Sequence, residues 1–130
     1  MPSKSCTILI VEDDEWFAAS LEAAIQTALP EVNISTTGDP AVAMTLIDDN
    51  SPNLLLADLH LGERNFFTLL NELASYPDTL ALPKIILSSS GGQLRTDDLV
   101  NYGIAAIYDK KTYNFNDLLT KIKELINYGK

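Results

Sequence analysis

Residues 7–14 have the sequence Thr7-Ile8-Leu9-Ile10-Val11-Glu12-Asp13-Asp14, in which a β-branched and apolar run ends in three acidic residues. A short apolar run with such an end predicts a buried strand. Uninterrupted apolar strands are typical of parallel sheets that helices cover on both faces. Ligands bind at the carboxyl ends of the strands in such sheets, so the stretch predicts a binding site as well as a strand.

Polar side chains follow three further apolar runs of the same kind. They are Asp58 after residues 53–57, Ser88 after residues 83–87 and Lys110 after residues 105–109. Because the carboxyl ends of parallel strands share one edge of the sheet, we expect these side chains to meet Glu12 and Asp13 there. Three carboxylates, a hydroxyl and an ammonium in one pocket suit a divalent cation and a phosphoryl group.

Apolar residues at helical spacing separate these runs and predict amphipathic helices. Their predicted buried positions are Phe17, Leu21, Ala24, Ile25 and Ala28; Ala43, Leu46 and Ile47; Phe66, Leu69, Leu70 and Leu73; and Leu118, Leu119, Ile122, Leu125 and Ile126. A helix is expected to begin with Asp39 as its N-cap and Pro40 as its first residue. A weaker helix is expected near residues 94–102, and residues 76–78 are expected to form a loop.

A half-buried strand at residues 32–36 completes five alternating strand and helix units. This alternation predicts an α/β protein with a doubly wound (βα)5 fold and a five-stranded parallel sheet. We expect residues 1–130 to form a single domain, with a core from about residue 6 to residue 128.

The composition is that of an ordinary globular protein of 130 residues, with 46% hydrophobic residues and a net charge of −9. The negative charge argues against nucleic acid or an anionic membrane as a direct partner. Cys6 is alone, which excludes a disulfide framework and fits a reducing compartment. Residues 1–5 lack the apolar stretch of a signal peptide, and no run is long enough to span a bilayer. We therefore expect a soluble, cytoplasmic protein.

The predicted acidic cluster needs a compensating charge. Two carboxylates about 5 Å apart repel by roughly 3 kcal/mol at an effective dielectric constant near 20. A bound cation, Lys110 or protonation has to offset this repulsion, and oxygen ligands favour Mg²⁺ or Mn²⁺. Asp58 stands alone at its strand end, which suits a nucleophile that becomes an acyl phosphate. Ser88 and Lys110 would then each contact a phosphoryl oxygen.

Each of these residues also has a plainer explanation. Asp13 and Asp14 are the kind of residue that caps a helix, and a lone Asp after a strand is often a turn residue. A lone Ser88 or Lys110 carries little information. The functional interpretation depends on all of them falling at strand ends in one sheet.

These motifs resemble those of the receiver domain of two-component response regulators, a CheY-like domain, over about Cys6 to Tyr128. Residues 8–14 are similar to the first acidic motif of the family and residues 55–59 to its phosphoacceptor motif. Ser88 lies thirty residues after Asp58, and Lys110 seven residues after Gly103, as the switch hydroxyl and the lysine of the family do. The resemblance implies phosphorylation of Asp58 by a histidine kinase or a phosphotransferase. It also implies Mg²⁺ held by Asp13, Asp58 and the backbone carbonyl of His60, with Glu12 acting largely through water.

The chain departs from the family pattern at three places. Ile107 stands where an aromatic residue is usual, and Tyr108 is expected on the opposite face of the strand. Lys111 replaces a proline that follows a cis bond, so we predict a trans bond or a remodelled loop there. The loop at residues 59–65 lacks the usual proline and Asp-Gly pair. In this loop, the His60 side chain is predicted to line, with Ser90, the path of water to Asp58.

The leading hypothesis is a switch controlled by phosphorylation of Asp58 rather than an enzyme that turns over a substrate. Its signal would pass through the fourth helix, fifth strand and fifth helix, to a fused effector domain or a homodimer. The main alternative is a docking module that works without phosphorylation. A metal-dependent phosphatase is disfavoured because His60 replaces the second acid, and a flavodoxin-like cofactor protein because the first loop is acidic.

Overall fold

The computed structural model describes residues 6–58, 60–61, 64–89 and 96–129. Its main sheet has five parallel strands in the order β2-β1-β3-β6-β7. These strands are β1 (Cys6–Val11), β2 (Val32–Thr37), β3 (Leu54–Ala57), β6 (Lys84–Ser88) and β7 (Ile104–Asp109). The prediction of a doubly wound α/β fold with a five-stranded parallel sheet is confirmed.

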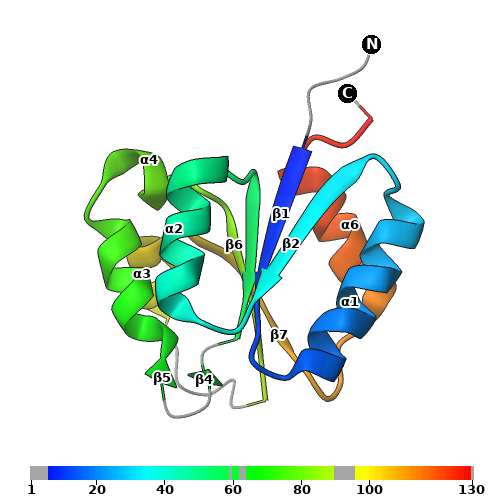
Figure 1. The fold of residues 1–130 in the computed structure, drawn as a ribbon, viewed down its shortest axis with the longest axis horizontal. Helices are drawn as coiled ribbons and strands as arrows, with labels where there is room; N and C mark the ends of the chain where they lie inside the picture. The colour runs from blue at the N-terminus through cyan, green and yellow to red at the C-terminus, as the bar shows by residue number, and fades with distance from the viewer. Residues whose placement is uncertain (1–5, 59, 62–63, 90–95, 130) are drawn as a thin grey trace.

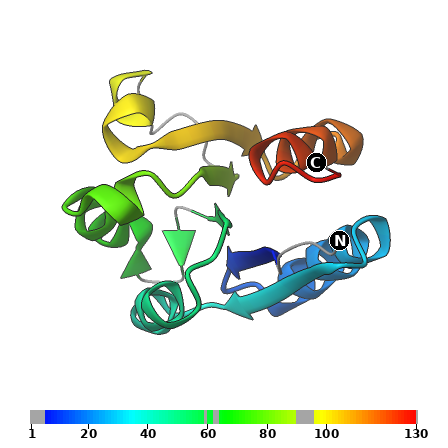
Figure 2. The same cartoon turned by 90° about the horizontal axis from the view of Figure 1, so that it is seen from above.

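Helices cover both faces of this sheet (Figures 1 and 2). One face carries α1 (Glu15–Ala28) and α6 (Phe115–Leu125), and the other carries α2 (Pro40–Asn50), α3 (Phe66–Ala74) and α5 (Thr96–Tyr102). No helix in the described part of the chain combines the length and the apolar character needed to cross a membrane.

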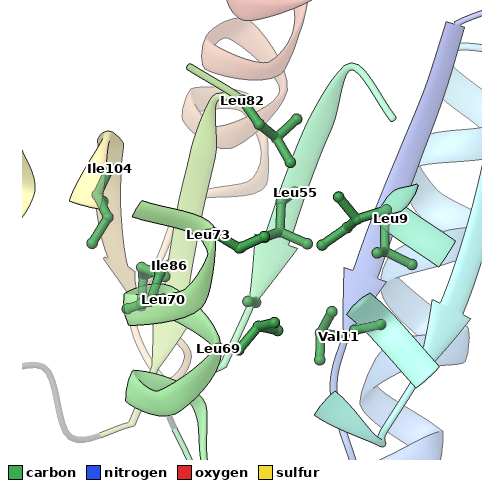
Figure 3. Packing of buried hydrophobic residues seen from close by; sticks show 12 residues of the cluster. Leu9, Val11, Leu55, Leu69, Leu70, Leu73, Leu82, Ile86 and Ile104 are labelled. Atoms are coloured by element: carbon green, nitrogen blue, oxygen red, sulfur yellow. The ribbon is translucent and has the colours of Figure 1, made fainter. Parts of the chain in front are cut away.

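The strands supply the core because their side chains alternate between the two faces. Leu9 and Leu55 point toward the side of α2 and α3, whereas Ile8 and Leu56 point toward α1 and α6. In Figure 3 the leucines of α3 lie over the same face as Leu9 and Leu55. All four strand side chains are at most 1% exposed. Burial of each stabilises the fold by about 1.5–3 kcal/mol, which is more than a surface ion pair provides.

Polar residues set the helix starts as the sequence predicted. The Asp39 side chain accepts a hydrogen bond from the Ala41 backbone N–H at 2.8 Å, and Pro40 is the first residue of α2. Asp14 caps α1 in the same way, by accepting from the Phe17 N–H at 3.0 Å. Of the two acids that we considered as caps of this helix, the structure therefore assigns Asp14.

Two predictions of loops were wrong. Residues 77–80 form a short helix, α4 (Pro77–Leu80), that the proline at its first position favours. After Asp58 the chain forms a short antiparallel hairpin, in which β4 (His60–Leu61) pairs with β5 (Arg64–Asn65). The weaker helix begins at Thr96 in the described residues, and residues 94 and 95 lie outside them.

A lysine is completely buried at the opposite end of the sheet from the predicted site. Lys84 is the first residue of β6 and is 0% exposed. Its Nζ donates hydrogen bonds to the carbonyl oxygens of Thr79 at 2.8 Å, Leu80 at 3.2 Å and Leu82 at 2.7 Å. No ion pair to Lys84 occurs among the described residues. The ammonium thus pairs with three carbonyl groups of α4 and the loop that follows it, at the end of the helix where carbonyl groups lack intrahelical partners.

Gly103 makes room for this contact. It has a φ of +68°, and a Cβ atom there would lie 2.3 Å from the Leu80 carbonyl oxygen and 3.3 Å from Lys84 Nζ. A larger residue would be strained by its backbone angle and would also collide with a carbonyl group. Gly103 directly follows the last residue of α5, and it also allows α4 to approach the start of β7.

Because of Lys84, the free energy of unfolding should change with pH in the alkaline range. Burial lowers its pKa from 10.5 to about 8. Between these values the unfolded chain binds more protons at Lys84 than the folded chain does. Its contribution to the free energy of unfolding is therefore lowest below pH 8 and rises toward pH 10.5. We expect the stability of wild type relative to Lys84→Met to increase by up to about 3 kcal/mol over this range.

Chemical denaturation of both proteins at several pH values between 7 and 10.5 measures this difference. Lys123→Met, which removes an exposed lysine of α6, is the matched control and should show no such trend. Parallel stability profiles for wild type and Lys84→Met would contradict the prediction.

Candidate functional site

The carboxyl ends of four strands meet at the lower edge of the sheet in Figure 1. Backbone hydrogen bonds continue the sheet one residue past its strands and fix the residues that follow. The Glu12 N–H donates to the Thr37 carbonyl at 2.9 Å, the Asp58 N–H to that of Val11 at 3.1 Å, and the Lys110 N–H to that of Ser88 at 3.2 Å. The sheet itself therefore positions the candidate residues.

Glu12, Asp58 and Lys110 form a charged cluster at this edge. Lys110 Nζ lies 2.7 Å from Glu12 Oε1 and 3.0 Å from Asp58 Oδ2. Glu12 is 5% exposed and Asp58 is 6% exposed. The second oxygen of Glu12 accepts a hydrogen bond from the Asp14 N–H at 3.1 Å. Breaking a buried pair of this kind is costly, because the partner is left as an uncompensated charge.

Two carboxylates share one ammonium, and the pKa values reflect this imbalance. Burial raises the pKa of Glu12, although the hydrogen bond and charge of Lys110 and the Asp14 N–H oppose the rise. Burial lowers the pKa of Lys110, but the hydrogen bonds and charges of Glu12 and Asp58 together outweigh it, so this pKa lies above its usual value. The cluster keeps its lysine charged and retains an excess negative charge when both acids are ionised.

The other candidate residues are not part of this cluster of ion pairs. Ser88 is the last residue of β6 and is fully buried, and Asp13 is exposed in the loop between β1 and α1. The backbone of His60 lies in β4, whereas Ser90 lies outside the described residues. Within the described ranges no three acidic, histidine or cysteine side chains are grouped as a metal site. The oxygen donors of Glu12, Asp13 and Asp58 nevertheless have the chemistry that Mg²⁺ and Mn²⁺ prefer.

The sequence did not predict that Phe17 and Gly38 contact the candidate site at the carboxyl edge of the sheet. Phe17 was predicted only as a buried helix residue, but its ring centroid lies 4.5 Å from Lys110 Nζ. Gly38 was not among the predicted site residues, but a Cβ atom there would lie 2.9 Å from the Asp13 Cα and 3.2 Å from the Glu12 carbonyl oxygen. Both contacts join segments that are far apart in the sequence. The sequence therefore held no signal for the contact of Phe17, and for Gly38 the only signal was its position next to the helix cap Asp39.

Comparison with known proteins identifies the family. Residues 8–123 match the family model of the response regulator receiver domain. The chain belongs to this family. It is therefore a receiver domain of two-component response regulators, and the predicted resemblance is confirmed.

Individual relatives agree with this membership. The regulatory protein VanRB of Enterococcus faecalis is 30% identical over 122 residues, which are 94% of this chain and 53% of VanRB. The receiver domain of a DNA-binding response regulator from Colwellia psychrerythraea is 26% identical, with a TM-score of 0.80 over 95% of this chain and 99% of that chain. The Mn²⁺-bound form of the response regulator Rcp1 is 22% identical, with a TM-score of 0.68 over 95% of this chain and 93% of that chain. The chain spans about half the length of VanRB.

The departures of this receiver domain from the family pattern are visible in the structure. Ile107 packs on the side of α2, α3 and α5, whereas Tyr108 packs on the side of α1 and α6. The predicted alternation is confirmed, so Tyr108 does not take the place of the usual aromatic residue. The described residues contain no cis peptide bond, as predicted for the bond before Lys111.

Gly38 should tolerate no side chain without displacing the acidic loop. A Cβ atom at 2.9 Å from the Asp13 Cα forces the backbone to shift. We expect Gly38→Ala to lower the free energy of unfolding by about 1–3 kcal/mol, as overpacking does. Denaturant unfolding followed by circular dichroism measures the loss.

Gly129→Ala is the control for this prediction. A Cβ atom at Gly129 meets nothing within 4 Å, although its φ is +84°, so its cost is limited to backbone strain. Gly38, unlike Gly129, has no positive φ, so a loss in Gly38→Ala would come from the contact with the acidic loop. An unchanged free energy of unfolding for Gly38→Ala would contradict the prediction.

Proposed function

We propose that this receiver domain is a switch in which Asp58 accepts a phosphoryl group from a histidine kinase or a phosphotransferase. The observation that carries the proposal is the position of Asp58. It is a buried carboxylate at the ligand-binding edge of the sheet, and it holds the Lys110 ammonium at 3.0 Å. A buried acid with a fixed cationic partner suits a reaction that builds negative charge at that point.

In the proposed transfer, a carboxylate oxygen of Asp58 forms a bond to phosphorus. The bond between phosphorus and the donor nitrogen breaks, and its electron pair leaves with the imidazole of the donor. The acyl phosphate carries more negative charge than the carboxylate did. Lys110 then exchanges a carboxylate contact for a phosphoryl oxygen, and Ser88 donates its hydroxyl hydrogen to another.

A divalent cation belongs to this proposal. Asp13, Asp58 and the backbone carbonyl of His60 would hold Mg²⁺ or Mn²⁺, with Glu12 acting largely through water. The all-oxygen donor set supports this assignment, as does the Mn²⁺-bound form of the similar protein Rcp1. When bound, the cation supplies positive charge that neutralises the phosphoryl oxygens.

The proposed switch is a signalling domain of the cytoplasm rather than an enzyme with a released product. Residues 1–130 would act as a single receiver domain, with any effector domain lying elsewhere. Its output would use the surface formed by α5, β7 and α6, either toward a fused effector or in a homodimer. It has no direct role in binding nucleic acid or membrane, because the net charge of −9 opposes both.

A docking module that works without phosphorylation is the second candidate. Ile107 favours it, because an aliphatic side chain at this position removes the aromatic rotamer that would follow Ser88. The intact cluster of Glu12, Asp58 and Lys110 favours the switch instead.

Phosphorylation by acetyl phosphate tests the proposal directly. We expect wild type with Mg²⁺ to gain one phosphoryl group, because the proposed phosphoacceptor Asp58 is a buried carboxylate whose Oδ2 lies 3.0 Å from Lys110 Nζ. Intact-mass spectrometry measures the gain. Asp58→Asn, which removes the nucleophilic oxygen but keeps the shape of the side chain, should gain nothing, and neither should wild type without a divalent cation.

The same experiment separates the two candidates. If wild type binds Mg²⁺ but stays unmodified, the docking module becomes the better explanation. If Asp58→Asn is modified as readily as wild type, Asp58 is not the phosphoacceptor.

A further inference from the structure

The ammonium group of Lys110 is enclosed by an aromatic ring as well as by two carboxylates. Its Nζ lies 4.5 Å from the centroid of the Phe17 ring, and it contacts Glu12 and Asp58 at 2.7 and 3.0 Å. The Lys110 side chain is 16% exposed. A cation over the face of an aromatic ring is attracted by the negative potential of that face, and more strongly when water is excluded. The ring therefore adds an attraction for the ammonium to those of the two carboxylates.

Phe17 is itself held from two directions. It lies in the first turn of α1, where its backbone N–H donates to the cap residue Asp14 at 3.0 Å. Its ring meets the ring of Tyr113 edge to face, with centroids 6.4 Å apart and an angle of 72°. The Tyr113 backbone N–H donates to the Asp109 carbonyl at 2.9 Å, in the turn that also carries Lys110. The turn that carries Lys110 thus also carries Tyr113, whose ring packs against Phe17.

A lysine side chain has several rotatable bonds, and two acidic oxygens do not by themselves fix all of them. The ring restricts the remaining freedom from the side of α1 and α6. Ile107, on the other side of the sheet, offers no aromatic face. Among the described residues, Phe17 is the only aromatic residue whose ring lies against the Lys110 ammonium.

We propose that Phe17 is a positioning residue whose ring holds the Lys110 ammonium against Glu12 and Asp58, and thereby sets the rate at which Asp58 accepts a phosphoryl group. The second half of this inference rests on the proposed function of Asp58. The first half concerns a contact of the unmodified protein and is measured without phosphorylation.

Two kinds of substitution at Phe17 distinguish the effect of the aromatic face from the effect of the size of the side chain. Phe17→Leu keeps an apolar side chain and removes the aromatic face, whereas Phe17→Tyr keeps the face. Phe17→Met is a second non-aromatic variant for the case in which Phe17→Leu does not fold. Phe115→Leu is the matched control, because Phe115 packs against the same apolar cluster and begins α6.

The first measurement is the NMR chemical shift of the Lys110 ε-methylene protons, assigned with Lys110→Met. The ring current of Phe17 should shift these protons upfield in wild type and in Phe17→Tyr. They should return to the ordinary lysine position in Phe17→Leu and keep the wild-type shift in Phe115→Leu. An ordinary shift in wild type would overturn the inference, because the ring would not then lie over the ammonium.

The second measurement is the rate of phosphorylation by acetyl phosphate with Mg²⁺. We expect Phe17→Leu to slow it by about two- to fivefold, which corresponds to a single cation–π contact. Phe17→Tyr and Phe115→Leu should react at close to the wild-type rate. A phosphorylated wild type whose rate Phe17→Leu leaves unchanged would overturn the inference alone. A wild type that is not phosphorylated overturns the proposed function itself.

Discussion

One ammonium group shared by two buried carboxylates is the interaction on which the candidate site depends. Lys110 compensates Glu12 and Asp58, which are 5% and 6% exposed and so lie almost out of water. The arrangement exists only because β1, β3 and β7 run parallel and end at one edge. The hydrophobic core and the charged cluster are therefore not independent, since the core fixes the strand register that brings the three charges within hydrogen-bonding distance.

The local sequence was sufficient to predict the features that follow from alternation and capping. The apolar runs gave the strands, the Asp39-Pro40 pair marked the start of α2, and the period of two in β7 placed Ile107 and Tyr108 on opposite faces. The same reasoning brought Glu12, Asp58 and Lys110 together, because parallel strands share their carboxyl edge. Each of these inferences needed only neighbouring residues and the class of sheet.

The features that were missed depend on contacts across the fold. Helix α4 has only four residues, which are too few to show helical periodicity. Phe17 looked like any apolar helix residue, and its contact with Lys110 spans the sheet edge. Gly38 looked like a turn residue until its distance to the Asp13 backbone was known. Spacing along the chain carries no information about such approaches.

A lysine lies at each end of the sheet, but the two lysines have different partners and only Lys84 is fully buried. Lys110 is held by two carboxylates, whereas Lys84 is held by three backbone carbonyl groups. An acylating reagent reaches an amine only when that amine is neutral and exposed to solvent. Lys84 is 0% exposed, so a reagent can reach it only after α4 separates from β6. Its rate of chemical labelling therefore reports how often this end of the domain opens, which makes Lys84 an internal probe of local unfolding.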